Sequence, residues 1–368
     1  YLENEKKYNV DMKKMEDIAK QLSAVFKNYK YLFNTNVKIN GNEITSFRST
    51  SEDVNLKLPH NSVVIKVSAT FEDDNRVKTA DDLTLQYENP DEIPSIDALV
   101  ERVRKFADDC MEMRNAPVME EYYKGPVMYE DEAAKQVITA TYLAPDQFYG
   151  QQNYTENPKS LGQKLGKKII DERISIVNST DKTEYNGEKL YGHYQVDADG
   201  FKPEAELSIV EKGVFKTMLN RTTPAMYAEK STANSRLANS PAQSIPLLGV
   251  GTLHVKADGT TKDDNMLKTL LKAAKKQKLD YAYVVTTPSG YTSLRLYQVD
   301  VKTGERKLVK HNRITLPTES QMKKFTAISD RPFVSNNVQP YTYSTITPAS
   351  TIVGDAELTK PVLNSGKA

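Results

Sequence analysis

Side chains that could bind a metal ion are few in this chain and lie far apart. The histidines are His60, His193, His254 and His311, and the single cysteine is Cys110. Protein zinc sites use ligands at short spacings such as HExxH or CxxC, and neither these motifs nor HExxxH occur in the sequence. The standard zinc signatures are therefore missing.

Motifs for other chemistries are missing as well. The sequence contains no GxxxxGK[ST] or GxGxxG phosphate loop and no GxSxG nucleophile elbow. Asp197 and Asp199 precede Gly200, but no further acidic ligands follow, so a tight turn is favoured over a calcium loop. A Ser-His-Asp site assembled from distant residues stays open as an alternative, because such sites have no fixed spacing.

Length and charge restrict the class of protein. The chain has 368 residues, enough for two domains, and 50 basic against 49 acidic side chains give a net charge of +1. Nucleic-acid binding by phosphate neutralisation normally requires a basic excess, so we expect no nucleic-acid partner. No apolar run approaches the roughly 20 residues that span a bilayer, so we expect no membrane span.

The first part of the chain predicts helices flanking an antiparallel sheet. Apolar residues recur every three or four positions from Met12 to Phe26, and a second helix is predicted from an N-cap at Ser95 to Arg114. Between them, apolar and polar residues alternate over residues 31–39, 44–58, 62–71 and 77–87. Turns are predicted at Asn40-Gly41, at His60-Asn61 and at residues 73–75.

The rest of the chain predicts a short strand at residues 127–129, a helix from Asp131, and then a β-rich half. Strands are expected at residues 175–177, 206–210, 214–219, 252–255, 281–286, 294–299 and 307–309, and helices at residues 263–276 and 319–325. The predicted fold is α+β: an N-terminal antiparallel sheet with flanking helices (residues 1–157), followed by a β-rich C-terminal domain (residues 158–368).

Several stretches, in this order and spacing, resemble one known family. They are GPVMYEDEAA (residues 125–134), LGQKLGK (161–167), GHYQVDADG (192–200), EKGVFK (211–216), ITPAS (346–350) and ELTK (357–360). The chain is similar to the TldD/PmbA family, peptidase-related proteins once named modulators of DNA gyrase. The resemblance covers roughly residue 47 to the end of the chain.

The resemblance implies a lost metal site. Active family members carry HExxxH on the helix after the EAA segment, and this chain has Thr139, Ala140 and Ala144 at the His, Glu and His positions. A family histidine in a later loop is matched by Asn234, and no cysteine follows Cys110 to supply the family's thiolate ligand. Because zinc needs imidazole or thiolate ligands and a glutamate base, we expect no catalytic zinc and no cofactor.

Three functions are compatible with this resemblance. We expect a non-catalytic protein, a dimeric peptide-binding or partner subunit of a proteolytic system, with a peptide groove formed by Thr139, Tyr142, Leu143 and Arg236. An extended peptide would add to a sheet edge there. The alternatives are an active metallopeptidase with atypical or partner-supplied ligands, and a purely structural assembly protein, in which that helix face is core or dimer contact.

The resemblance also implies partners, and the first residue of the chain suggests a compartment. The expected partner is a second copy, or a homologue that carries the metal motif. Because the chain starts at Tyr1 rather than at methionine, the expectation is an exported or periplasmic bacterial protein whose signal has been removed, with the cytoplasm as the alternative.

Overall fold

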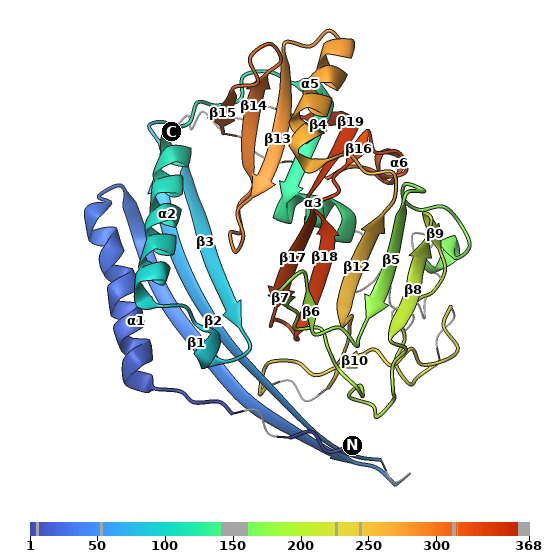
Figure 1. Cartoon of the computed structure of the whole chain (residues 1–368). Helices are drawn as coiled ribbons and strands as arrows, with labels where there is room; N and C mark the ends of the chain where they lie inside the picture. The colour runs from blue at the N-terminus through green and yellow to red at the C-terminus, as the bar shows by residue number, and fades with distance from the viewer. Residues whose placement is uncertain are drawn as a thin grey trace, which may run out of the picture.

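The computed structural model is a mixed α+β structure built on three β-sheets (Figure 1). It describes residues 1–4, 7–51, 54–140, 161–224, 227–242, 245–310, 314 and 316–359. A three-stranded N-terminal sheet stands opposite two six-stranded sheets, which are formed by the remainder of the chain. The predicted fold class is therefore confirmed.

The N-terminal sheet is antiparallel in the order β1-β2-β3, as predicted. Helices α1 and α2 pack on it and bury an apolar core that includes Ile18, Leu22, Phe106 and Cys110. The elements are α1 (Met12–Ala24), the 3-10 turn η1 (Val25–Asn28), β1 (Leu32–Ser49), β2 (Asn55–Glu72), β3 (Lys78–Tyr87), the 3-10 turn η2 (Pro90–Glu92) and α2 (Ile96–Asn115). Helix α2 begins where expected, because the Ser95 hydroxyl accepts a hydrogen bond from the Ala98 N–H at 3.3 Å.

Two of the predicted turns are wrong. Residues Asn40 and Gly41 lie inside β1 and pair with Val64 and Val63 of β2, and His60 and Asn61 lie inside β2. Gly41 leaves room for the Tyr8 side chain, since a Cβ there would lie 2.4 Å from the Tyr8 hydroxyl oxygen. The alternating segments therefore merge into two 18-residue strands.

The chain passes directly from one six-stranded sheet into the other, because β18 of the first is followed at once by β19 of the second. One has the order β17-β18-β12-β5-β8-β9 and the other β15-β14-β13-β4-β19-β16, and only Ala349 separates β18 from β19. Their strands are β4 (Tyr123–Asp131), β5 (Ile174–Ser179), β8 (Glu206–Glu211), β9 (Val214–Phe215), β12 (Thr252–Ala257), β13 (Tyr281–Thr287), β14 (Arg295–Asp300), β15 (Arg306–Val309), β16 (Ala327–Ile328), β17 (Pro332–Asn337), β18 (Tyr343–Pro348) and β19 (Ser350–Leu358).

Short elements complete this half. They are α3 (Glu132–Thr139), η4 (Leu161–Lys164), the hairpins β6 (Glu184–Tyr185) with β7 (Glu188–Lys189) and β10 (Ser235–Arg236) with β11 (Leu247–Leu248), η5 (Asp263–Asn265), α5 (Met266–Lys276) and α6 (Glu319–Met322). Every strand predicted between residues 175 and 309 is present, whereas β16 to β19 were not predicted.

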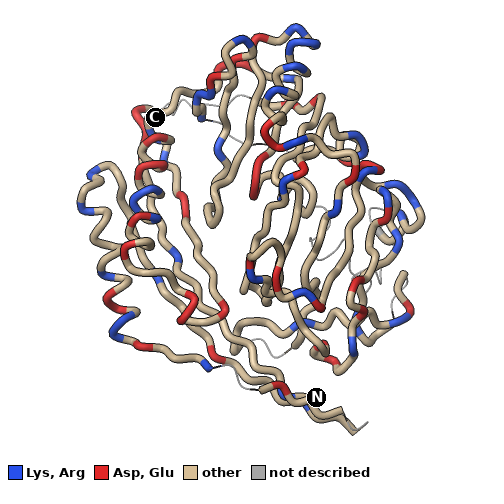
Figure 2. Tube along the Cα trace, in the orientation of Figure 1, with Lys and Arg blue, Asp and Glu red and all other residues tan. Residues whose placement is uncertain are grey.

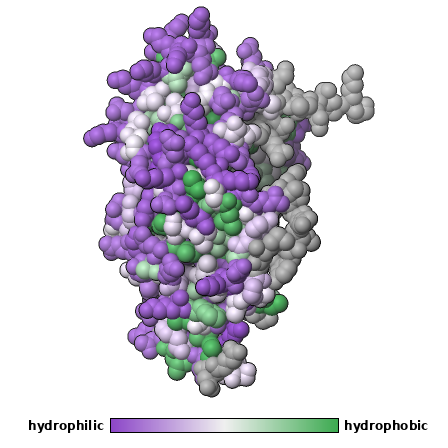
Figure 3. All heavy atoms as spheres, turned by 90° about the vertical axis from the view of Figure 1, so that its right-hand side faces the viewer, coloured by the Kyte–Doolittle hydropathy of each residue, from purple (hydrophilic) through white to green (hydrophobic). Residues whose placement is uncertain are grey.

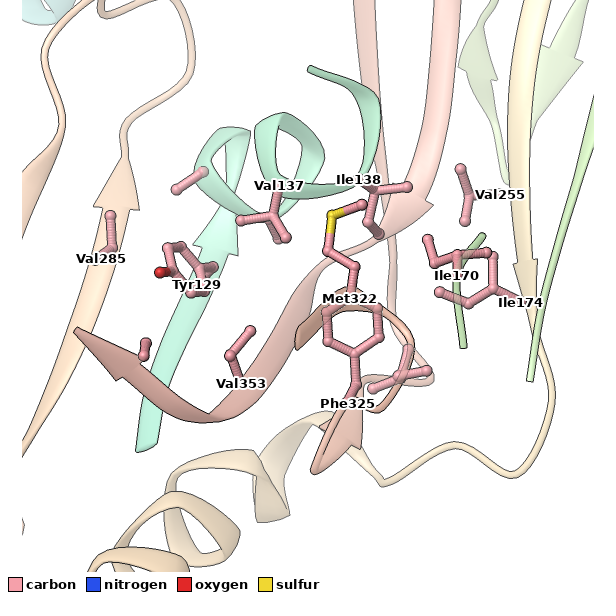
Figure 4. Packing of buried hydrophobic residues seen from close by; sticks show 14 of the residues in the cluster. Tyr129, Val137, Ile138, Ile170, Ile174, Val255, Val285, Met322, Phe325 and Val353 are labelled. Atoms are coloured by element: carbon pink, nitrogen blue, oxygen red, sulfur yellow. The ribbon is translucent and has the colours of Figure 1, made fainter. Parts of the chain in front are cut away.

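Helix α3 lies in the core between the two large sheets. Its Val137 and Ile138 point inward among Tyr129 of β4 and Val353 of β19 (Figure 4). Strand β4 pairs with β13 and β19, so β4 and α3 belong by pairing and packing to the sheets of the C-terminal half. The predicted division between residues 157 and 158 lies outside the described residues.

Ion pairs join the N-terminal sheet to the rest of the molecule. Arg295 of β14 donates to Asp81 of β3 at 2.6 Å, and both side chains are less than 5% exposed. At the far end of the sheet, Arg48 of β1 lies 2.6 Å from Asp199, which Arg221 also contacts at 3.1 Å. These pairs fix the position of the N-terminal sheet relative to the C-terminal half.

The outer surface is polar and mixed in charge. Basic and acidic residues alternate along the chain trace (Figure 2), and one side of the C-terminal half is mainly hydrophilic, with apolar side chains in small groups (Figure 3). No helix in the described part of the chain is long and apolar enough to cross a membrane.

Candidate functional site

Strand β3 of the N-terminal sheet faces β17 of the C-terminal half (Figure 1), and residues of both strands line a cleft between them. One part of it, the β17 groove, has a volume of about 480 Å³. Its walls are Thr84–Tyr87 of β3, Val334–Asn337 of β17 and the loop Ser289–Thr292, and α3 contributes Glu132 and Lys135. The β17 groove thus brings together two strands that each end a sheet.

Strand β17 presents one unpaired backbone edge to this groove. It is the end strand of its sheet and, among the residues that the structure describes, pairs only with β18; each of its six residues is partly exposed. The Ala349 N–H donates to the Arg331 carbonyl at 2.7 Å, and hydrogen-bonded pairs alternate along an antiparallel ladder. The backbone groups of Phe333 and Ser335 therefore face β18, and those of Val334 and Asn336 face away from it.

The next outward-facing group already has a partner from β3. The Val338 N–H donates to the Gln86 side-chain oxygen at 2.9 Å, and the Gln86 amide nitrogen lies 3.5 Å from the Asn337 side-chain oxygen. Pro332 begins β17 at a position that needs no ladder N–H, as is usual for proline in edge strands. Within the described part of the chain, this edge is thus bonded at Val338 and unpaired at Val334 and Asn336.

Helix α3 places a hydrogen-bonded pair of opposite charges on β17. The Ser335 hydroxyl donates to Glu132 at 2.8 Å and accepts from Lys135 at 3.0 Å, and Lys135 also pairs directly with Glu132. The Asp131 backbone has a φ of 49°, in the left-handed region, where the chain turns sharply from β4 into α3. This turn orients the first turn of α3 toward the groove.

A second part of the cleft, the β2 groove, has a volume of about 530 Å³. Leu58–Asn61 of β2 and residues Ser235 and Arg236 of β10 line it, together with Tyr194 and the segment Tyr1–Asn4. The Arg236 guanidinium lies 3.8 Å from the Tyr194 ring centroid and donates to the Thr342 carbonyl at 3.0 Å. The arginine is therefore held flat against the groove wall.

Three of the four residues at the expected metal-ligand positions lie in the described part of the chain, namely Thr139, Ala140 and Asn234. Thr139 is 4% exposed, and its hydroxyl donates to the Lys135 carbonyl of its own helix at 2.8 Å. Ala140 is exposed at the end of α3, and Asn234 is buried, donating to the Gly249 carbonyl at 2.9 Å. Ala144 lies outside the described residues.

Of the residues expected to form a peptide groove, only Arg236 is seen in one. It lines the β2 groove, whereas Thr139 contributes to neither groove wall. Tyr142 and Leu143 lie outside the described residues. Because two of the four residues lie outside the described part of the chain, the expected groove stays a prediction.

Sequence reasoning missed β17, which forms one wall of the β17 groove. The strand has only six residues, begins with Pro332 and ends with two asparagines, a composition typical of loops. The available signal was the pair Phe333 and Val334 bounded by Pro332, since a proline at the first position of a strand is characteristic of a sheet edge.

Comparison with known proteins gives a consistent family and fold. Residues 123–358, from the first residue of β4 to the last of β19, match the model of the PmbA/TldA metallopeptidase C-terminal domain. A search among curated proteins found no match to this chain.

Three solved structures are similar over almost the whole chain. A putative modulator of a DNA gyrase from Thermotoga maritima has a TM-score of 0.66 and 16% identity, covering 97% of this chain and 78% of that one. A second, from Bacteroides thetaiotaomicron, gives 0.60 and 12%, covering 96% and 72%. TldE from Thermococcus kodakarensis gives 0.54 and 15%, covering 98% and 79%. At these identities the likeness establishes a shared fold.

Proposed function

The chain belongs to the TldD/PmbA family, and we propose that it is a non-catalytic member that binds an extended peptide in the β17 groove. In this role it acts within a proteolytic system as a dimer, either with a second copy or with a homologue that carries the metal motif. The peptide adds to β17 as a further strand.

The side chains at the family's ligand positions do not suit zinc. The Thr139 hydroxyl is buried and already donates to a backbone carbonyl, and an alanine side chain has no donor atom. Asn234 offers a metal only its amide oxygen, which is a ligand for calcium rather than for zinc, and its amide nitrogen donates to Gly249 and Tyr194. Without zinc ligands and a glutamate at position 140, the described residues provide no activated water, and we propose that the bound peptide is not cut.

The single observation that carries the peptide-binding proposal is the open edge of β17 inside a groove. Outward backbone groups at Val334 and Asn336 give two donors and two acceptors to an incoming strand. The Gln86 side chain bonds to the next outward N–H, at Val338, in the way that an added strand would. Glu132 and Lys135 beside Ser335 supply charges of both signs to the side chains of the peptide.

An active metallopeptidase with ligands supplied by a partner subunit is the alternative. It predicts zinc and cleavage in a complex, whereas the proposal predicts binding without cleavage. Purified protein should bind a fluorescein-labelled Thr-Val-Thr-Val peptide, measured by polarisation, and leave it intact on prolonged incubation. Zinc in stoichiometric amount, together with cleavage of unfolded peptides that is lost on chelation, would contradict the non-catalytic proposal. Failure of the tetrapeptide to bind would contradict the peptide-binding one.

A further inference from the structure

The two grooves lie end to end in one cleft. On the N-terminal wall, Thr84–Tyr87 of β3 line the β17 groove, and Glu88 and then Asn61–Leu58 of β2 line the β2 groove. On the other wall, β17 lines the first groove, and Thr342 with Arg236 lines the second. A strand that lay along β17 and continued in the same direction would therefore enter the β2 groove.

A cluster of three side chains separates the grooves. Val64 of β2, Tyr191 and Val338 pack together and are each less than 9% exposed. Tyr191 belongs to the lining of both grooves, and Val338 directly follows β17. This cluster, with the tyrosine ring at its centre, forms a partition across the cleft.

Glu88 and Glu92 of the N-terminal half, together with Lys189 of β7, hold the tyrosine side chain in place. The Tyr191 hydroxyl donates to Glu92 at 2.9 Å. Lys189 lies 2.7 Å from Glu88 and 2.6 Å from Glu92, and its ammonium group is 5.1 Å from the Tyr191 ring centroid. The partition is therefore attached to both walls of the cleft.

The backbone of the partition is also fixed. The Ser344 hydroxyl oxygen accepts hydrogen bonds from the N–H groups of Tyr191 at 2.8 Å and of Gly192 at 3.2 Å. A Cβ on Gly192 would lie 2.4 Å from the Gly251 carbonyl oxygen, so the chain is closely packed there. The segment that carries Tyr191 consequently has little room to move aside.

We infer that Tyr191 determines specificity for peptide length, by closing the β17 groove at one end. Strands pair residue for residue, so a peptide on Val334–Asn337 has about four paired residues before it meets the ring. Longer peptides must leave the cleft at that point and gain no further backbone hydrogen bonds. This inference rests on the proposed peptide binding at β17.

The test measures affinity against length. Fluorescein-labelled peptides of alternating threonine and valine, with four, six and eight residues, are titrated with the wild-type chain, Tyr191→Ala and Tyr191→Phe. The wild type should bind all three lengths equally, and Tyr191→Phe should too, because it keeps the ring and loses only the bond to Glu92. In Tyr191→Ala, the eight-residue peptide should bind at least about tenfold tighter than the four-residue peptide, since its additional residues can continue into the β2 groove and make contacts there.

A second variant protects the test against misfolding. Val64→Ala trims the same partition from β2 and should shift the length dependence in the same direction, and thermal unfolding followed by circular dichroism shows whether each variant is folded. Equal length dependence in the wild type and in both alanine variants would overturn the inference, while tetrapeptide binding still supported the proposed function. If no peptide bound to the wild type, the proposed function would fail, and the inference with it.

Discussion

The side-chain oxygen of Gln86 accepts a hydrogen bond from the Val338 N–H at 2.9 Å, and so joins the edge of the N-terminal sheet to the end of β17. This one contact crosses the cleft at the point where its two grooves meet. It also shows the direction in which the outward backbone groups of β17 point. Both the proposed strand addition and the partition at Tyr191 depend on that direction.

Replacing Gln86 tests the contribution of this contact to stability. Gln86→Ala leaves the Val338 N–H without its partner, and should lower the free energy of unfolding by about 1 kcal/mol in urea titrations. Gln86→Glu is the matched control, because a carboxylate oxygen still accepts from that N–H, and it should lose less than the alanine variant. Equal losses in the two variants would show that packing, and not the hydrogen bond, matters at this position.

Proline substitutions in β17 separate the two edges of the strand. Val334→Pro removes an N–H that faces the groove, so it should weaken tetrapeptide binding with little change in the urea midpoint. Ser335→Pro removes a ladder N–H, and should destabilise the protein by about 1–3 kcal/mol relative to Ser335→Ala. Peptide binding that survives Val334→Pro at full affinity would contradict strand addition at this edge.

The buried pair between Asp81 and Arg295 should be important for stability. Asp81→Ala leaves the Arg295 charge buried without its partner and frees the Ser293 N–H, which Asp81 accepts from at 3.2 Å. We expect a loss of about 3–5 kcal/mol in chemical denaturation. The neighbouring Asp82 pairs with Lys66 near the surface, so Asp82→Ala should cost only about 0–1 kcal/mol. Similar losses in the two variants would contradict this difference.

Acid should destabilise the protein through His254. Burial, the largest cause, and the charges of Lys182 and Lys256 together lower the pKa of His254 to about 4, while the charge of Glu206 opposes them. An unfolded histidine titrates near pH 6.5, so between about pH 6.5 and 4 the unfolded state binds more protons, and stability falls as the pH is lowered. Urea unfolding at pH 7 and pH 5 should show a larger drop for the wild type than for His254→Gln. An equal drop would assign the acid sensitivity to other groups.

The sequence predicted those elements whose periodicity is long and regular. Helix α2, with its Ser95 cap, and the strands β5, β12 and β13 were identified because capping and alternation are local properties. The Asn40-Gly41 turn was wrong because these two residues pair with Val64 and Val63 of β2 inside a continuous ladder. Local patterns do not report such tertiary contacts.

The candidate site was less predictable than the fold. The resemblance led correctly to the family, and Arg236 does line a groove, but β17 and Tyr191 gave no signal. The open edge of β17 exists only because β18 pairs with it on one side and β3 stops short of it on the other. The partition exists only because Val64 and Val338, 274 positions apart, meet at Tyr191. Both features arise from long-range pairing, which a single sequence does not encode in a readable motif.

Binding of N-methylated peptides tests the central claim most directly. Two Thr-Val-Thr-Val peptides, methylated on the backbone nitrogens of residues one and three or of residues two and four, are compared with the unmethylated peptide by fluorescence polarisation. Because only alternate residues of an added strand bond to β17, one methylated peptide should lose at least about tenfold in affinity and the other should bind nearly as well as the parent. Equal affinity for all three peptides would contradict strand addition at β17.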